Sequence, residues 1–228
     1  MARPVPFALG DYFRSVFICC NLDHKKFLEW VNMRDLPNQV SPRFGRAVFL
    51  DRDGTINVDT HYPHRVQELV FIPRAIEGIR LLSDLEAHLI VVSNQAGIPL
   101  GIFTQEQMSS FNRGISDHVS KAKGRLDAFY FSPFLEAKNL PSGVGSHSTT
   151  KPSPGMLLEA AQDYSIDLAK SFMIGDKTSD VVAGQRVNCT TILVLTGKAG
   201  KEEDAVPCEP DHIVADLYEA AVLVQKLF

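Results

Sequence analysis

Short runs of consecutive apolar residues recur from residue 47 to the end of the chain, and amphipathic segments separate them. Runs of this length are typical of strands that are buried on both faces of a parallel sheet. The first run, AVFL, leads directly into the polar stretch DRDGT. The pattern predicts strands at 47–50, 89–94, 128–132, 171–176, 190–197 and 212–215.

The segments between the predicted strands carry helix signals. Pro73 suits the first turn of a helix, and Ile79 and Leu82 follow it at helical spacing. Thr104 and Gln107 form a capping box. We expect helices at 73–85, 105–122, 154–164 and 179–186, and from Asp216 to the end. Repeated alternation of strand and helix predicts an α/β fold, a doubly wound, Rossmann-like parallel sheet with helices on both faces.

The first 46 residues do not follow this alternation. Residues 23–36 are compatible with an amphipathic helix, and a polar linker follows them. We therefore divide the chain into an N-terminal arm, 1–46, and an α/β domain, 47–228. The arm is interpreted as a packing element, with dimerisation as the alternative, so the chain is expected to be a monomer or a weak dimer.

Composition excludes several classes of protein. The 228 residues are 45% hydrophobic, the formal net charge is −4 and the pI is about 6.0. The chain has no long basic run of the kind that binds nucleic acid, and it has no apolar stretch long enough for a membrane span. We expect no signal peptide. The four cysteines have neither zinc-site spacing nor the pattern of a disulfide framework, which favours a reducing, cytoplasmic location.

Polar residues follow several predicted strands at the point where each strand ends. In open parallel sheets, ligands bind outside the carboxyl ends of the strands. Lys151 precedes a helix at the same edge, so these residues are expected to converge on one crevice. They are Asp51, Asp53, Ser93, Asn94, Lys151 and Asp176.

Asp51 and Asp53 are separated by one residue and point the same way if the backbone is extended. Their repulsion favours a hard divalent cation with oxygen ligands, and Mg²⁺ is usual where phosphate also binds. Gly54 permits a sharp turn after the pair, and Thr55 can hydrogen-bond within it. The alternative for this stretch alone is a solvated Asp-Gly turn.

The later motifs favour phosphate chemistry. Ser93 and Asn94 place a hydroxyl and an amide just past a strand, and Lys151 supplies a point charge for a phosphate. Asp176 and Asp180 add two carboxylates beyond a further strand. Each residue alone has an ordinary structural explanation, as a turn, a surface charge or a helix cap, but their order along the chain is specific.

The motifs FLDRDGTINVD, VVSNQAGI, KPSPGMLLEAA and MIGDKTSD resemble the haloacid dehalogenase (HAD) superfamily of phosphohydrolases over about residues 47–228. The similarity is greatest to the branch that contains heptose-bisphosphate and histidinol-phosphate phosphatases. It implies a HAD-like fold, a small phosphorylated substrate and Mg²⁺. No large cap domain is expected, because the spacing between the motifs leaves no room for one.

The resemblance also implies roles for individual residues. Asp51 would be the nucleophile that forms an aspartyl-phosphate, and Asp53 would act as general acid and then as general base. Phosphate binding would fall to Ser93, Asn94 and Lys151. The metal ligands would be Asp51, the backbone carbonyl of Asp53 and Asp176, with Asp180 and Thr55 in the surrounding shell.

The chain departs from this branch in a loop that usually binds zinc through C-x-H and C-x-C. The corresponding residues are Ser132, Phe134, His147 and Thr149, and one imidazole does not make a tetrahedral zinc site. We therefore predict no zinc.

Two cations expected at the substrate are also missing, because Thr150 and Leu100 stand where relatives place arginines. Whether the site recognises a second phosphate on the substrate is therefore left open by the sequence. His61 and His64 are interpreted as turn residues, with substrate contact as the alternative.

These observations predict a Mg²⁺-dependent phosphomonoester hydrolase that acts on a small phosphorylated metabolite, most simply a sugar (bis)phosphate. The alternatives are a histidinol-phosphate phosphatase, a polynucleotide 3′-phosphatase and a catalytically silent scaffold with the same fold. The acidic pI argues against a polynucleotide 3′-phosphatase. The presence of all the motif residues argues against a catalytically silent scaffold.

Overall fold

The computed structural model describes residues 44–135 and 147–228. All of them belong to one compact unit that spans residues 35–228. The predicted helix at 23–36 and most of the predicted arm lie outside the described residues, so the boundary at residue 46 stays a prediction.

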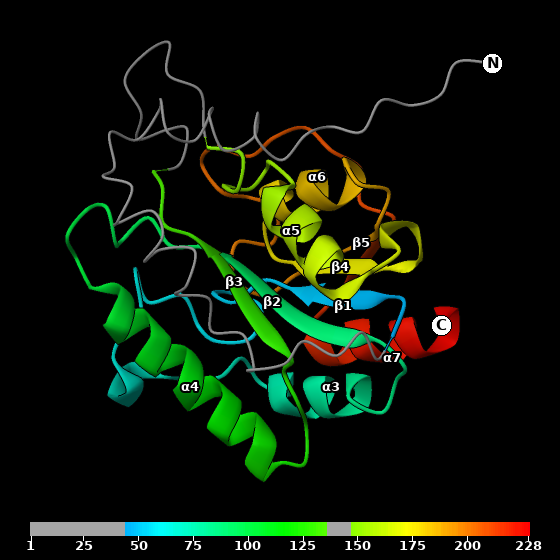
Figure 1. Ribbon diagram of the computed structural model, residues 1–228, viewed down its shortest axis with the longest axis horizontal. Coiled ribbons are helices and arrows are strands. Elements are labelled where there is room, and N and C mark those ends of the chain that lie inside the picture. The colour runs from blue at the N-terminus through cyan, green and yellow to red at the C-terminus, as the bar shows by residue number, and fades with distance from the viewer. Residues whose placement is uncertain (1–43, 136–146) are drawn as a thin grey trace. The chain divides into compact units, whose positions relative to one another are not determined.

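The described residues contain one six-stranded sheet in which all strands are parallel (Figure 1). The strand order is β3-β2-β1-β4-β5-β6. From β1, in the middle of the sheet, the chain proceeds outward to β3 and then returns to the other side of β1. The order therefore reverses between β1 and β4, which is where ligands bind in doubly wound folds. The strands are β1 (Ala47–Leu50), β2 (His88–Asn94), β3 (Ala128–Ser132), β4 (Phe172–Gly175), β5 (Thr190–Val194) and β6 (His212–Val214).

Alternate residues of β1 enter two separate apolar clusters, one on each face of the sheet. Val48 and Leu50 pack on the face covered by α3 and α7, whereas Ala47 and Phe49 pack on the opposite face with residues of α5. Figure 1 shows α5 and α6 on one side of the sheet and α3, α4 and α7 on the other. The helices are α3 (Ala75–Leu82), α4 (Gln105–Lys121), α5 (Gly155–Tyr164), α6 (Thr178–Gln185) and α7 (Leu217–Leu227). The prediction of a doubly wound α/β fold is confirmed.

Most predicted elements are present, with shifted ends. The predicted helix at 73–85 begins only at Ala75, because Arg74 has a left-handed backbone with φ of 64°. The capping box at Thr104 is present. β5 ends at Val194, three residues early, because the chain turns there. Two short 3-10 helices, η1 (Val66–Glu68) and η3 (Leu168–Lys170), were not predicted.

No large domain is inserted between β1 and β2, where the fully described segment contains only η1 and α3. The carboxyl ends of the central strands are therefore not covered by an insertion from this segment. In the described part of the chain, no helix is both long enough and apolar enough to cross a membrane.

Candidate active site

The carboxyl ends of β1, β2 and β4 bring the predicted site residues together. Asp51 directly follows β1, Ser93 and Asn94 end β2, and Asp176 directly follows β4. A small cleft at this edge is lined by Asp51, Asp53, Ser93, Asn94, Lys151, Lys177 and Ser179. The convergence that the strand ends predicted is therefore present in the structure.

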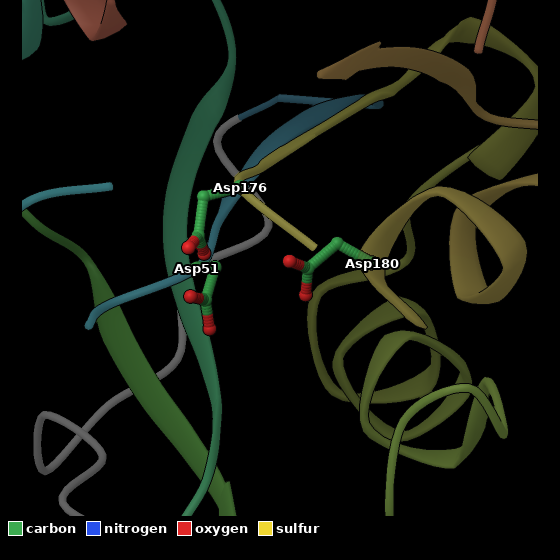
Figure 2. Close-up of side chains that lie close together, drawn as sticks. All are labelled: Asp51, Asp176 and Asp180. Atoms are coloured by element: carbon green, nitrogen blue, oxygen red, sulfur yellow. The ribbon is translucent and has the colours of Figure 1, made fainter. Parts of the chain in front are cut away.

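Three buried carboxylates face one another at the centre of this edge (Figure 2). One carboxylate oxygen each of Asp51, Asp176 and Asp180 lies within 4.8 Å of the others. The Lys151 ammonium lies 2.6 Å from Asp51 Oδ1 and 2.6 Å from Asp180 Oδ1. Three carboxylates against one ammonium leave an excess of negative charge in a site that is shielded from water.

This excess is reflected in the pKa values. Burial, and then the charges of Asp51 and Asp180, raise the pKa of Asp176 well above its usual range. Burial also raises the pKa of Asp180, although Lys151 opposes that shift. For Lys151, burial alone would lower the pKa, but the carboxylates of Asp180 and Asp51 outweigh it and raise the pKa. The carboxylate cluster therefore favours a further cation.

The residues present fit a hard divalent cation. All three side chains offer carboxylate oxygens, the ligands that Mg²⁺ prefers. Asp176 Oδ1 is buried and has no hydrogen-bond partner among the described residues, which is costly unless a cation takes that place. Asp180 was expected outside the ligand set, but the structure brings its carboxylate into the same cluster as Asp51 and Asp176.

The position of Lys151 is fixed by β2. Asn94 donates from Nδ2 to the Lys151 carbonyl at 3.1 Å and accepts from the Lys151 amide at 2.9 Å. The Lys151 ammonium also donates to the Val92 carbonyl at 2.8 Å. Asn94 was predicted to bind phosphate, and in the structure its amide group is engaged in holding the backbone of Lys151.

Asp53 is held by Arg52, a residue that the sequence analysis did not single out. Arg52 is 1% exposed and donates to both carboxylate oxygens of Asp53, from Nε at 3.0 Å and from Nη2 at 2.8 Å. Asn57 and Gln95 each donate to the same carboxylate. The guanidinium also donates to Asn112 Oδ1. Bidentate pairing fixes the plane of a carboxylate, so Arg52 orients Asp53. The sequence contains one signal of this role, because Arg52 stands between the two aspartates of the first motif.

The turn after Asp51 brings the backbone against Asp176. Gly54 has φ of +96°, and a Cβ there would lie 2.4 Å from Asp176 Oδ2. Only glycine therefore allows this approach. The expected side-chain hydrogen bond of Thr55 is absent, since its buried hydroxyl has no partner in the described residues. The turn is instead closed by backbone bonds to the Arg52 carbonyl, including one from Ile56 at 2.9 Å.

The four positions that correspond to zinc ligands contact one another without any thiolate. We call Ser132, Phe134, His147 and Thr149 the clasp. His147 Nδ1 bonds to the Thr149 hydroxyl at 2.8 Å, and that hydroxyl bonds to Ser132 Oγ at 3.1 Å. The rings of Phe134 and His147 stack with centroids 3.6 Å apart. Neutral hydroxyls and an aromatic ring do not fit a zinc site.

A wider cavity of about 660 Å³ adjoins the small cleft. Its lining includes Asp53, Asp59, His61, Tyr62, Lys151, Lys198 and Lys201. His61, interpreted from sequence as a turn residue, also lines this cavity. His64 instead stacks on Phe103, with ring centroids 5.1 Å apart. The volume is in the range of small-molecule sites.

Comparisons with known proteins agree with this fold and site. Residues 148–220 match the HAD-hydrolase-like family model. A D-glycero-β-D-manno-heptose-1,7-bisphosphate 7-phosphatase from Yersinia pestis is 39% identical over 153 residues, which cover 67% of this chain and 81% of that protein. A D-glycero-D-manno-heptose-1,7-bisphosphate 7-phosphatase from Thermosynechococcus vestitus is 33% identical over 181 residues, 76% of this chain and 92% of that protein.

Solved structures lead to the same family. A putative HAD-like phosphatase from Mesorhizobium loti has a TM-score of 0.70 and 30% identity, and the match covers 85% of this chain and 92% of that one. The D,D-heptose 1,7-bisphosphate phosphatase from B. bronchiseptica, solved with magnesium and phosphate, shares the fold with a TM-score of 0.67 at 23% identity, over 80% of this chain and 99% of that one.

The fold and the carboxylate site thus define a phosphohydrolase of the HAD class. The chain belongs to the HAD-like phosphatases, in the branch that contains the heptose-1,7-bisphosphate 7-phosphatases.

Proposed function

We propose that this chain hydrolyses a phosphomonoester bond of a small phosphorylated sugar, D-glycero-D-manno-heptose 1,7-bisphosphate in the first instance, through an aspartyl-phosphate on Asp51. The observation that carries the proposal is the buried pairing of Asp51 with Lys151 in a cleft that Ser93 also lines. A carboxylate can attack a phosphate dianion only where cations offset the repulsion. The named activity of the relatives supports the choice of substrate.

The reaction has two steps. In the first, a carboxylate oxygen of Asp51 attacks phosphorus, the bond from phosphorus to the ester oxygen breaks, and Asp53 donates a proton to the leaving oxygen. In the second, Asp53 removes a proton from a water molecule that attacks the same phosphorus. This frees inorganic phosphate, restores the Asp51 carboxylate and leaves Asp53 protonated for the next cycle.

Other residues prepare these steps. Lys151 offsets phosphoryl charge. Ser93 Oγ accepts from Gln95 Nε2 at 2.7 Å, which leaves its own proton to donate to a phosphate oxygen in the cleft. Arg52 and Gln95 hold the carboxylate of Asp53, so that its proton transfers are directed to one place.

We propose that Mg²⁺ is held by Asp51, the Asp53 carbonyl and Asp176, with Asp180 and Thr55 around them. When bound, the ion supplies positive charge that makes attack by a carboxylate on a phosphate feasible. The cluster of buried carboxylates and the unpartnered Asp176 Oδ1 support this assignment. We further propose that the protein needs no zinc, is a monomer or weak dimer, and acts in the cytoplasm. Free Cys189 and Cys208 are consistent with that location.

Phosphate release with Mg²⁺ tests the proposal. The panel comprises heptose 1,7-bisphosphate, hexose monophosphates, histidinol phosphate and a 3′-phosphorylated oligonucleotide. We expect the highest kcat/KM for the heptose bisphosphate. A preference for histidinol phosphate or the oligonucleotide would replace the substrate assignment. Failure to hydrolyse any of them, or p-nitrophenyl phosphate, would favour a catalytically silent protein.

A further inference from the structure

We propose that Lys198 and Lys201, which line the cavity next to the carboxylate site, form a subsite for a second anionic group of the substrate. This inference deepens the proposed function and rests on it for the identity of the substrate. The chemical class that fits is a small organic phosphate with a second phosphate or a carboxylate group.

Both lysines line the same cavity of about 660 Å³ as Asp53 and Lys151. Thr150 and Leu100 stand where the family resemblance places substrate-binding arginines, and neither side chain carries a charge. Thr150 is fully buried and its hydroxyl bonds to Ser132 at 2.7 Å. Beyond Lys151, the cationic residues of the lining are Lys177 and, in the loop after β5, Lys198 and Lys201.

The loop that carries the two lysines is bound directly to the carboxylate site. The Thr196 hydroxyl donates to the Gly54 carbonyl at 2.7 Å. The backbone amide of Lys198 donates to Asp176 Oδ2 at 2.7 Å, and that of Gly200 donates to the Asp176 carbonyl at 2.8 Å. These bonds fix the loop relative to the carboxylates, so a ligand group held by the loop is also held at a constant distance from the reacting atoms.

The two ammonium groups are available to a ligand. Within residues 44–135 and 147–228, neither makes a hydrogen bond or an ion pair, and both side chains are exposed to solvent. Lys151 differs, because its ammonium is buried and engaged by Asp51, Asp180 and the Val92 carbonyl. A phosphate contacted by two lysines receives charge-assisted hydrogen bonds, which are stronger than neutral ones.

Acidic residues also line this cavity and repel an anion; beyond Asp53 they are Asp59, Glu202, Glu203 and Asp204. Glu202 is engaged elsewhere, since its Oε1 accepts from the Thr178 amide at 2.6 Å and from the Thr178 hydroxyl. Glu203 lines the cavity and is exposed. An anion in contact with two ammonium groups is attracted more strongly than a more distant carboxylate repels it, because Coulomb energy falls with distance. Neutralising Glu203 should therefore strengthen binding of the second anionic group, whereas neutralising Lys198 or Lys201 should weaken it.

The test compares heptose 1,7-bisphosphate with heptose 7-phosphate, which differ only in the distal phosphate. We expect Lys198→Ala/Lys201→Ala to lower the ratio of their kcat/KM values by roughly 10–100-fold, about one order of magnitude or less per charge-assisted contact. Glu203→Gln should raise the ratio by about twofold. Lys170→Ala removes an exposed lysine of η3 and should leave the ratio unchanged.

Binding separates this subsite from the catalytic proposal. Calorimetry on the Asp51→Asn protein measures the affinity for the same two compounds without turnover. If the wild type hydrolyses neither compound, but the bisphosphate binds more tightly and loses that advantage in the lysine variants, the catalytic proposal fails and the subsite stands. If the bisphosphate binds no more tightly than the monophosphate, or the advantage survives loss of both lysines, the subsite is refuted.

Discussion

The clasp predicts that Ser132 and Phe134 are joined to His147 and Thr149 by direct contacts and not by a metal. The perturbation is His147→Ala, which removes the hydrogen bond to Thr149 and the ring stack on Phe134. A net hydrogen bond contributes about 0.5–1.5 kcal/mol and an aromatic pair about as much. Since His147 is only partly buried, we expect a loss of about 1.5 kcal/mol in the free energy of unfolding.

A loss of that size lowers the Tm of a domain of this length by roughly 3–6 °C. The assay is thermal unfolding followed by circular dichroism, with and without a strong chelator and with added zinc. Two matched variants divide the effect: His147→Phe keeps a ring for stacking and loses the hydrogen bond, and Thr149→Val keeps the size and loses the hydroxyl. Both should lie between the wild type and His147→Ala.

Two results would refute the reasoning. One is a wild-type Tm that falls on chelation and recovers with zinc, which would mean that a metal joins the residues of the clasp. The other is a His147→Ala protein that unfolds within 1 °C of the wild type, since the contacts of the clasp would then contribute nothing measurable.

The clasp also predicts a dependence on pH. Burial lowers the pKa of His147 below the usual value of 6.5. The unfolded chain therefore binds a proton at this side chain more readily than the folded chain, so acid favours unfolding. The contribution of His147 is fully present above about pH 6.5 and is lost as the pH falls through the folded-state pKa. The Tm difference between wild type and His147→Phe should be smaller at pH 5 than at pH 8, and a constant difference would contradict this.

Three further predictions concern the carboxylate site. Asp51→Asn should keep the fold and lower turnover by several orders of magnitude, so activity within about tenfold of wild type would remove Asp51 as the nucleophile. Arg52→Lys keeps a positive charge but loses the bidentate grip on Asp53, and kcat should fall roughly 10–100-fold; an unchanged kcat would show that Asp53 needs no such partner. Gly197→Ala places a Cβ 2.1 Å from Asp176 Oδ2 and should weaken Mg²⁺ binding, measured by calorimetry; wild-type affinity would contradict it.

The sequence alone determined the fold class and the location of the chemistry. Apolar runs such as AVFL specify strands buried on both faces, and the structure divides its residues between two clusters, one on each face. Because parallel strands place their carboxyl ends at one edge, Asp51, Ser93 and Asp176 could be assigned to one crevice before any contact was known. The fold class and the location of the site therefore follow from the local pattern of apolar residues and from the common direction of the strands.

The tertiary structure decided which of these residues touch and which others join them. The burial of Arg52 and its pairing with Asp53 depend on Asn112, which lies in α4, and on Gln95, which directly follows β2. The closeness of Asp180 to Asp51 depends on how α6 starts beside β4. Residue type and spacing do not encode such contacts, because they join segments that are distant in the chain.

The loop after β5 is the clearest case. Thr196 bonds to Gly54, 142 positions earlier in the chain, and this contact brings Lys198 and Lys201 to the cavity. In sequence they are two lysines in a polar loop, with the same pattern as any solvated turn. Only the strand order, which returns the chain to the other side of β1, puts their segment against the site. The sequence alone therefore predicted where the chemistry lies, and the packing of distant segments decided what surrounds it.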